Sequence, residues 1–200
     1  MSVIRAFIAI DLPEEVRQRL SRVSHKLQQQ LQPYPIRWVP PKNIHLTLKF
    51  LGDVSEHNLR MLTHLLAGEV ESHRPFEFGV GTLGAFPDIR RPRVIWVGIE
   101  APDELVALQR GIDHAMAKLG YTTERRPFQP HLTLARVSRN ATGAEVRDIS
   151  HVLQKTTVGF LGSTRVTEVH LYRSDLQPHG AVYTRLFTTS LNAETPPAVV

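Results

Sequence analysis

The 200-residue chain contains no cysteine. Disulfide bonds, thiolate metal sites and a cysteine nucleophile are therefore excluded, and because cysteine-free chains suit a reducing compartment, we expect a cytoplasmic protein. Long apolar runs are also missing: no stretch approaches the ~20 residues of a transmembrane helix. The apolar run over 3–10 is ended by Asp11 and Pro13 and lacks the features of a signal peptide, so we expect a strand there and no association with a membrane.

The composition is that of an ordinary globular chain. Apolar residues make up 42% and charged residues 22% of it, which is enough to bury a core in one large domain or two small lobes. The net charge of +5 is compatible with a polyanionic partner. Charge alone steers such a partner but does not identify it.

One tetrapeptide, His-Leu-Thr-Leu, occurs twice, at residues 45–48 and 131–134. In a strand, successive side chains point to opposite faces, so each copy offers an imidazole and a hydroxyl side by side. A single copy would most simply be an ordinary strand whose histidine bonds a nearby carbonyl group. Two copies in equivalent places favour a functional site, whereas the other eight histidines are expected to be surface or core residues.

The two copies end equivalent segments of a longer internal repeat. An apolar strand, a helix start with proline and acids, a helix and an extended connector precede each copy, at 3–31 and again at 94–119. We therefore expect a single domain over residues 1–190, with repeat halves of about 3–92 and 93–190 and pseudo-twofold symmetry. The last ten residues, 191–200, are expected to be a flexible tail.

Periodicity and turn residues place the remaining elements. Asp11 and Ser55 are the expected caps of helices that reach about Leu31 and Val70. A glycine-rich stretch is expected to end the strand that starts at Phe76 and to open into a loop with three arginines, which is either a phosphate contact or a solvated basic loop. The expected elements are strands 3–10, 44–51, 76–80, 94–99, 131–134, 158–161, 166–172 and 182–188, and helices 14–31, 55–70, 103–119 and 144–153.

Two His-x-Thr pairs suit the hydrolysis of a phosphodiester. A neutral imidazole takes a proton from water and a protonated one gives a proton to a leaving oxygen, so two histidines can divide the work. The hydroxyl groups of Thr47 and Thr133 can donate to the phosphoryl oxygens. No metal is required, and no third ligand stands at zinc-site spacing in either strand, so we expect no metal and no cofactor.

Strand parity adds one residue. Lys49 shares the predicted cleft face with His45 and Thr47, so it is a candidate for binding a substrate phosphate. The alternative is a strand-end lysine that reaches into solvent. On the same parity Leu46, Leu48 and Phe50 point the other way and are expected to lie in the core.

Three stretches, residues 5–10, 38–52 and 126–136, resemble the two-histidine phosphoesterase family. The resemblance covers residues 3–190. Within this family the chain most resembles the branch of RNA 2',3'-cyclic phosphodiesterases, once called 2'-5' RNA ligases. It implies an α+β, bilobal fold with two antiparallel sheets backed by helices and a central cleft between the motif strands. It also implies an RNA substrate whose single-stranded end carries a 2',3'-cyclic phosphate, and tRNA fragments are one source of such ends. We expect the protein to be a monomer.

The resemblance implies roles for the motif residues. By similarity, His45 is the proton donor to the departing ribose O3', His131 is the base that activates water, and the product carries a 2'-phosphate. The identical motifs cannot themselves tell the two histidines apart. Arg126, Phe128 and Arg136 are further candidates for stacking on or steering the RNA end.

Two other functions stay open at this point. The first is a cyclic phosphodiesterase for a free nucleotide or an ADP-ribose cyclic phosphate, with 2'-5' RNA ligation as a side reaction. The second is a non-catalytic module that binds RNA ends. Against it stands the pair of titrating imidazoles, which a pure binding module does not need.

Overall fold

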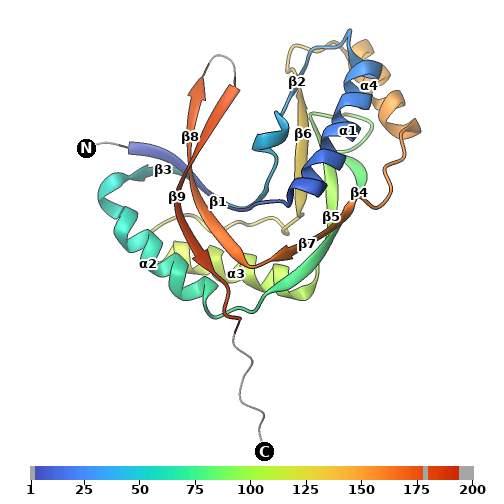
Figure 1. Cartoon of the computed structure of the whole chain (residues 1–200). Coiled ribbons are helices and arrows are strands. Elements are labelled where there is room, and N and C mark those ends of the chain that lie inside the picture. Colours follow the sequence, from blue (N-terminus) through green and yellow to red (C-terminus); the bar gives the residue numbers. More distant parts are fainter. Residues whose placement is uncertain (1–2, 178–179, 194–200) are drawn as a thin grey trace, which may run out of the picture.

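Two antiparallel β-sheets and four α-helices form the fold in the computed structural model, which describes residues 3–177 and 180–193 (Figure 1). None of the helices in these ranges has the length and apolarity needed to span a membrane. Residues 191–193 lie in no helix or strand, and the rest of the expected tail lies outside the described residues. The expected α+β architecture with two antiparallel sheets is confirmed.

Each sheet takes strands from both halves of the chain. The first sheet has the order β3-β1-β8-β9 and the second the order β2-β6-β5-β4-β7. The motif strands β3 and β6 therefore occupy equivalent places, each beside the strand that opens its repeat. The strands are β1 (Val3–Ile10), β2 (Ile36–Trp38), β3 (Leu46–Ser55), β4 (Phe76–Phe86), β5 (Val94–Glu100), β6 (His131–Val137), β7 (Gly162–Val166), β8 (Glu168–Gln177) and β9 (Gly180–Ser190).

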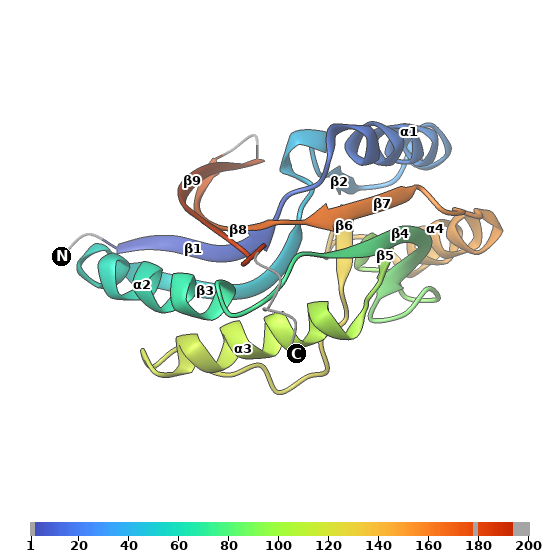
Figure 2. The same cartoon turned by 60° about the horizontal axis from the view of Figure 1, so that its bottom comes forward.

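Helices α1 and α3 each follow a strand of one sheet and contact a strand of the other sheet. Helix α1 follows β1 of the first sheet but contacts β7 of the second, and α3 follows β5 of the second sheet but contacts β3 of the first. Figure 2 shows α2 and α3 side by side beneath the first sheet, with α1 and α4 at the other end of the molecule. The helices are α1 (Glu14–Leu31), α2 (Leu59–Val70), α3 (Asp103–Ala117) and α4 (Gly143–Lys155), and two 3-10 turns are η1 (Pro41–Asn43) and η2 (Glu56–Asn58).

Two predicted helix caps are wrong. Pro13 and Asn58 occupy the N-cap positions of α1 and α2, and neither helix has a side-chain cap hydrogen bond. Ser55 lies a turn too early, because η2 intervenes, and Asp11 has partners elsewhere in the fold. A side-chain cap occurs instead at α4, where Thr142 and Glu145 form a capping box.

Glycines explain why two strands run further than expected. β3 continues past Gly52, whose φ of +69° lies in a region that glycine adopts without strain. β4 continues to Phe86, because its glycines serve close packing and not a loop: a Cβ on Gly84 would lie 2.1 Å from the indole of Trp96. Residues 158–161 are not a strand, and β7 begins at Gly162 instead.

A β-bulge at Leu48 reverses the predicted facing of Lys49 and Phe50 in β3, and a second irregularity follows at Leu51. Ile8 is paired with Lys49 but Ala9 is paired with Thr47, so Leu48 is an extra residue in β3. An extra residue moves all following side chains to the opposite face. Accordingly, Phe50 is 71% exposed, and its predicted core position is wrong, while Lys49 is buried.

Candidate active site

Both His-x-Thr pairs line one cavity of about 1220 Å³. His45 and Thr47 come from the first sheet and the segment before it, and His131 and Thr133 come from β6 of the second sheet. The other candidates from the sequence also lie on its wall, namely Lys49, Arg126, Phe128 and Arg136. The fold thus brings all eight candidate residues to one cavity, while their individual roles stay predictions.

The two imidazoles are held in the same way. Nδ1 of His45 lies 2.8 Å from the carbonyl oxygen of Asn43, and Nδ1 of His131 lies 2.7 Å from that of Gln129. A carbonyl oxygen can only accept, so Nδ1 carries the hydrogen in both rings. Nε2 is therefore the nitrogen that is left to exchange a proton with a substrate or water.

Aromatic rings enclose His45. Phe7 stacks on the imidazole with ring centroids 4.7 Å apart. The Tyr172 ring centroid lies 5.4 Å from that of Phe7 and 6.4 Å from that of His45, and the edge of Tyr183 meets His45 at 5.3 Å. Burial disfavours the charged ring and lowers the pKa of His45 to about 4, although the Asn43 carbonyl and the charge of Asp11 act in the opposite direction.

His131 has a more open setting. Phe86 meets the imidazole edge-on at 4.8 Å, and Trp96 lies tilted at 6.2 Å. Burial lowers the pKa of His131 as well, and the positive charge of Arg136 lowers it further. Both histidines are therefore mainly neutral at pH 7 in the free protein.

The motif threonines are available as donors. Thr47 and Thr133 are half-buried on the cavity wall. Their hydroxyl groups form no hydrogen bond to another residue within 3–177 and 180–193. Each can donate to an anionic oxygen placed between the histidines.

Lys49 is engaged inside the protein. Its ammonium group donates to Oδ1 of Asp113 at 2.5 Å and to the carbonyl oxygen of Thr122 at 2.9 Å. The alternative of a lysine that reaches into solvent is therefore wrong, since Lys49 is only 7% exposed. A contact between Lys49 and substrate stays a prediction.

Three further arginines line the cavity. Arg93 belongs to the three-arginine loop after β4, which the sequence left as either a phosphate contact or a solvated basic loop. It lines the cavity and donates to the carbonyl oxygen of Ser138. Arg91 of that loop pairs with Asp88 instead. Arg37 of β2 and Arg125 of the connector before His131 also line the cavity. Pairing of β2 with β6 places Arg37 there, and no sequence pattern predicts that pairing.

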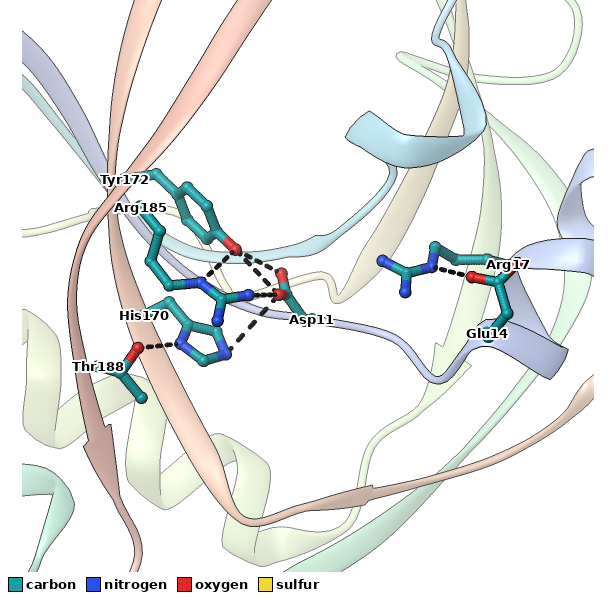
Figure 3. Close-up of polar contacts among 7 residues, drawn as sticks. All are labelled: Asp11, Glu14, Arg17, His170, Tyr172, Arg185 and Thr188. Carbon is teal, nitrogen blue, oxygen red and sulfur yellow. Dashed lines mark hydrogen bonds and ion pairs between the residues drawn. The ribbon is translucent and has the colours of Figure 1, made fainter.

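Figure 3 shows a polar cluster around Asp11 that no sequence pattern predicts. It lies near His45, since the ring centroids of Tyr172 and His45 are 6.4 Å apart. Asp11 accepts hydrogen bonds from the Tyr172 hydroxyl at 2.9 Å and from Arg185 at 2.5 Å. His170 is buried, with Nδ1 2.9 Å from the Thr188 hydroxyl and Nε2 3.8 Å from Asp11. The partners of Asp11 come from β8 and β9, more than 150 residues away in sequence.

Two antiparallel sheets that each present a His-x-Thr strand to a shared cavity define a phosphoesterase of the two-histidine class. The family model for LigT-like phosphoesterases matches the chain twice, over residues 10–96 and 97–183. The chain belongs to this family. The two matches follow the internal repeat.

Relatives and solved structures agree with this assignment. The chain is 38% identical over 181 residues to an RNA 2',3'-cyclic phosphodiesterase of Methanothermobacter thermautotrophicus, covering 90% of this chain and 95% of that protein. It is 34% identical to the RNA 2',3'-cyclic phosphodiesterase of Escherichia coli, covering 91% and 93%. The crystal structure of E. coli LigT complexed with 3'-AMP superposes with a TM-score of 0.74 at 32% identity, covering 95% of this chain and 99% of that chain.

Proposed function

We propose that the protein hydrolyses a terminal 2',3'-cyclic phosphodiester on RNA to a 2'-phosphomonoester. The observation that carries the proposal is the shared cavity with two imidazoles whose Nδ1 atoms are occupied by carbonyl groups and whose Nε2 atoms have no hydrogen-bond partner within residues 3–177 and 180–193. The names of the two relatives above supply the substrate class.

In the proposed step, water attacks phosphorus as the P–O3' bond breaks. Nε2 of His131 takes a proton from the attacking water, and protonated Nε2 of His45 gives a proton to O3'. Thr47 and Thr133 donate to the non-bridging oxygens, where negative charge increases in the transition state. The product keeps the phosphate on O2', and both histidines return to their starting states after one proton is exchanged with solvent.

Electrostatics support the histidines as proton carriers. A bound cyclic phosphate is an anion, and an anion beside a buried imidazole raises its pKa. Substrate binding therefore favours the protonated form of His45 that the leaving group requires. The same anion makes protonation of His131 by the attacking water easier.

The test is incubation with an oligoribonucleotide that ends in a 2',3'-cyclic phosphate, followed by identification of the hydroxyl group that keeps the phosphate. A 2'-phosphate product, unchanged by EDTA, is expected. His45→Ala and His131→Ala should each reduce kcat by at least about a hundredfold, the usual contribution of a general acid or base. Tight binding of the oligonucleotide without turnover would instead identify a binding module, and loss of activity on chelation would exclude the metal-free step.

Three finer points belong to the same proposal. An RNA substrate and a cysteine-free chain support a cytoplasmic location. We also infer a monomer, because the repeat places both histidines in one chain. We further infer that RNA fragments, such as those of tRNA, are the source of the cyclic phosphate end. Light scattering measures the oligomeric state. Sequencing of the RNA ends that accumulate without the enzyme identifies the source of the substrate.

A further inference from the structure

Tyr183, on β9 of the first sheet, lies beside His45 at the junction of two cavities. It lines the cavity of about 1220 Å³ that holds both histidines, and also a smaller one of about 340 Å³ whose wall includes His45. The edge of the Tyr183 ring meets the His45 imidazole at 5.3 Å and the Phe7 ring at 5.0 Å between centroids. These contacts hold the half-buried ring against the first sheet.

The hydroxyl group of Tyr183 is available to a ligand. It forms no hydrogen bond with another residue in the described part of the chain, although buried tyrosine hydroxyls usually have a partner. The hydroxyl of Tyr172, on the neighbouring strand, is bonded to Asp11. Among the described residues, the fully buried side-chain polar atoms without a partner are Trp96 Nε1 and Thr164 Oγ1, so the Tyr183 hydroxyl is accessible.

The strand that carries Tyr183 is tied to the turn before His45. Nδ2 of Asn43 donates to the carbonyl oxygen of Ala181 at 2.8 Å. The carbonyl oxygen of the same asparagine accepts from Nδ1 of His45 at 2.8 Å. In β9, Tyr183 is the register partner of Ser174 of β8. Asn43 therefore connects the His45 imidazole with β9 and fixes the position of Tyr183 relative to it.

Charges on the second sheet act on the Tyr183 hydroxyl across the cavity. Burial raises the pKa of Tyr183, whereas the positive charges of Arg136 and Arg37 act in the opposite direction. Both arginines lie on strands of the second sheet. Because the net direction is upward, the phenol keeps its hydrogen at neutral pH and can donate a hydrogen bond.

A phosphate between the histidines can use a third hydroxyl donor. Attack of water increases the negative charge on the two non-bridging oxygens, and each of these oxygens can accept more than one hydrogen bond. Thr47 and Thr133 supply one hydroxyl group each. Tyr183 adds a donor beside His45, where aromatic rings exclude water and electrostatic interactions are stronger than in solvent.

We propose that the Tyr183 hydroxyl donates a hydrogen bond to a non-bridging oxygen of the scissile phosphate and is a third catalytic donor beside Thr47 and Thr133. The inference rests on the proposed function and adds a catalytic residue from β9. Because the Tyr183 ring is fixed on one wall of the cavity, its hydroxyl contacts one of the two non-bridging oxygens. The two oxygens are therefore not equivalent in this contact.

The test uses Tyr183→Phe, which removes the hydroxyl group and keeps the ring contacts with His45 and Phe7. The substrate is a dinucleotide that ends in a 2',3'-cyclic phosphate. We expect kcat/KM to fall about tenfold, mostly through kcat, because the contact strengthens as charge increases in the transition state. Tyr121→Phe, at a half-buried tyrosine that lines neither cavity, is the matched control and should change neither kcat nor KM.

Phosphorothioate substrates separate a contact from a structural effect. The two diastereomers carry sulfur in place of one or the other non-bridging oxygen of the cyclic phosphate. Sulfur accepts hydrogen bonds only weakly, so the isomer with sulfur at the contacted position should lose almost no further activity in Tyr183→Phe. The other isomer should show the full tenfold loss. Equal losses for the two isomers would overturn the proposal, because a displaced His45 would affect both alike.

The two levels of the proposal fail separately. If the wild-type protein does not hydrolyse the unmodified dinucleotide, the proposed function is wrong. If it does so and Tyr183→Phe has the same kcat and KM as the wild type, the function stands and the Tyr183 contact is wrong.

Discussion

Lys49 of β3 and Asp113 of α3 form a buried ion pair, with Nζ 2.5 Å from Oδ1. The pair fixes the irregular connector that leads to His131, because Lys49 also donates to the Thr122 carbonyl group and Asp113 accepts from the backbone N–H of Glu124. One ion pair thus connects the first motif strand to the segment that precedes the second histidine. The cavity wall over 122–127 depends on it.

Removal of one member should therefore destabilise the fold. Lys49→Met leaves the Asp113 carboxylate buried without its partner, and a loss of about 3–5 kcal/mol in the free energy of unfolding is expected. The double variant Lys49→Met with Asp113→Asn should recover part of this loss, because no buried charge remains. Urea unfolding measures both, with Lys26→Met on the exposed face of α1 as the control. A stable Lys49→Met protein with a raised KM would indicate a substrate contact instead.

Local patterns predicted the parts of this fold that local physics determines. The apolar spacing of α1 and α3 and the repeated His-x-Thr strands could be read directly, because helix and strand periodicity are properties of consecutive residues. Strand partners were not accessible in this way. The placement of β4 beside β7, and of β8 beside β1, depends on contacts between distant segments.

The candidate site shows the same division. The four motif residues follow from the duplicated tetrapeptide, whereas Asp11 carried a misleading local signal. An aspartate just before a proline and two glutamates is typical of a helix cap, yet its partners Tyr172 and Arg185 lie on strands that only the tertiary fold brings near. Tertiary hydrogen bonds here override the local preference.

The bulge in β3 can be tested through stability. Phe50 is 71% exposed, so Phe50→Ala should cost less than about 1 kcal/mol in the free energy of unfolding. Leu48→Ala, at a residue that is 4% exposed, should cost about 2–5 kcal/mol. Chemical denaturation of the two variants gives the comparison. Similar large losses for both would mean that β3 has no bulge and that strict alternation holds.

Asp11 should influence activity through charge. Its carboxylate raises the pKa of His45, against the dominant effect of burial, so Asp11→Asn should lower that pKa further. Each unit by which the pKa of His45 falls reduces the fraction of protonated His45 at neutral pH about tenfold, and kcat/KM at pH 7 should fall by the same factor. Tyr172→Phe is the matched control, since it removes a hydroxyl group bonded to Asp11 and keeps the carboxylate. Equal pH shifts in the two variants would contradict a charge effect.

The pH dependence of the reaction follows from the two lowered pKa values. A general acid works below its pKa and a general base above it, so kcat/KM should be highest between the pKa of His45, about 4, and that of His131, which burial holds below 6.5. The maximum is therefore expected on the acid side of pH 6.5 for the free enzyme. Bound phosphate raises the pKa of both rings, so the maximum of kcat should lie at a higher pH than that of kcat/KM. Rates with 2',3'-cyclic AMP between pH 4 and 8 test this, with circular dichroism to confirm folding at each pH. A kcat/KM maximum above pH 7 would mean that the imidazoles are solvated and not buried in the free protein.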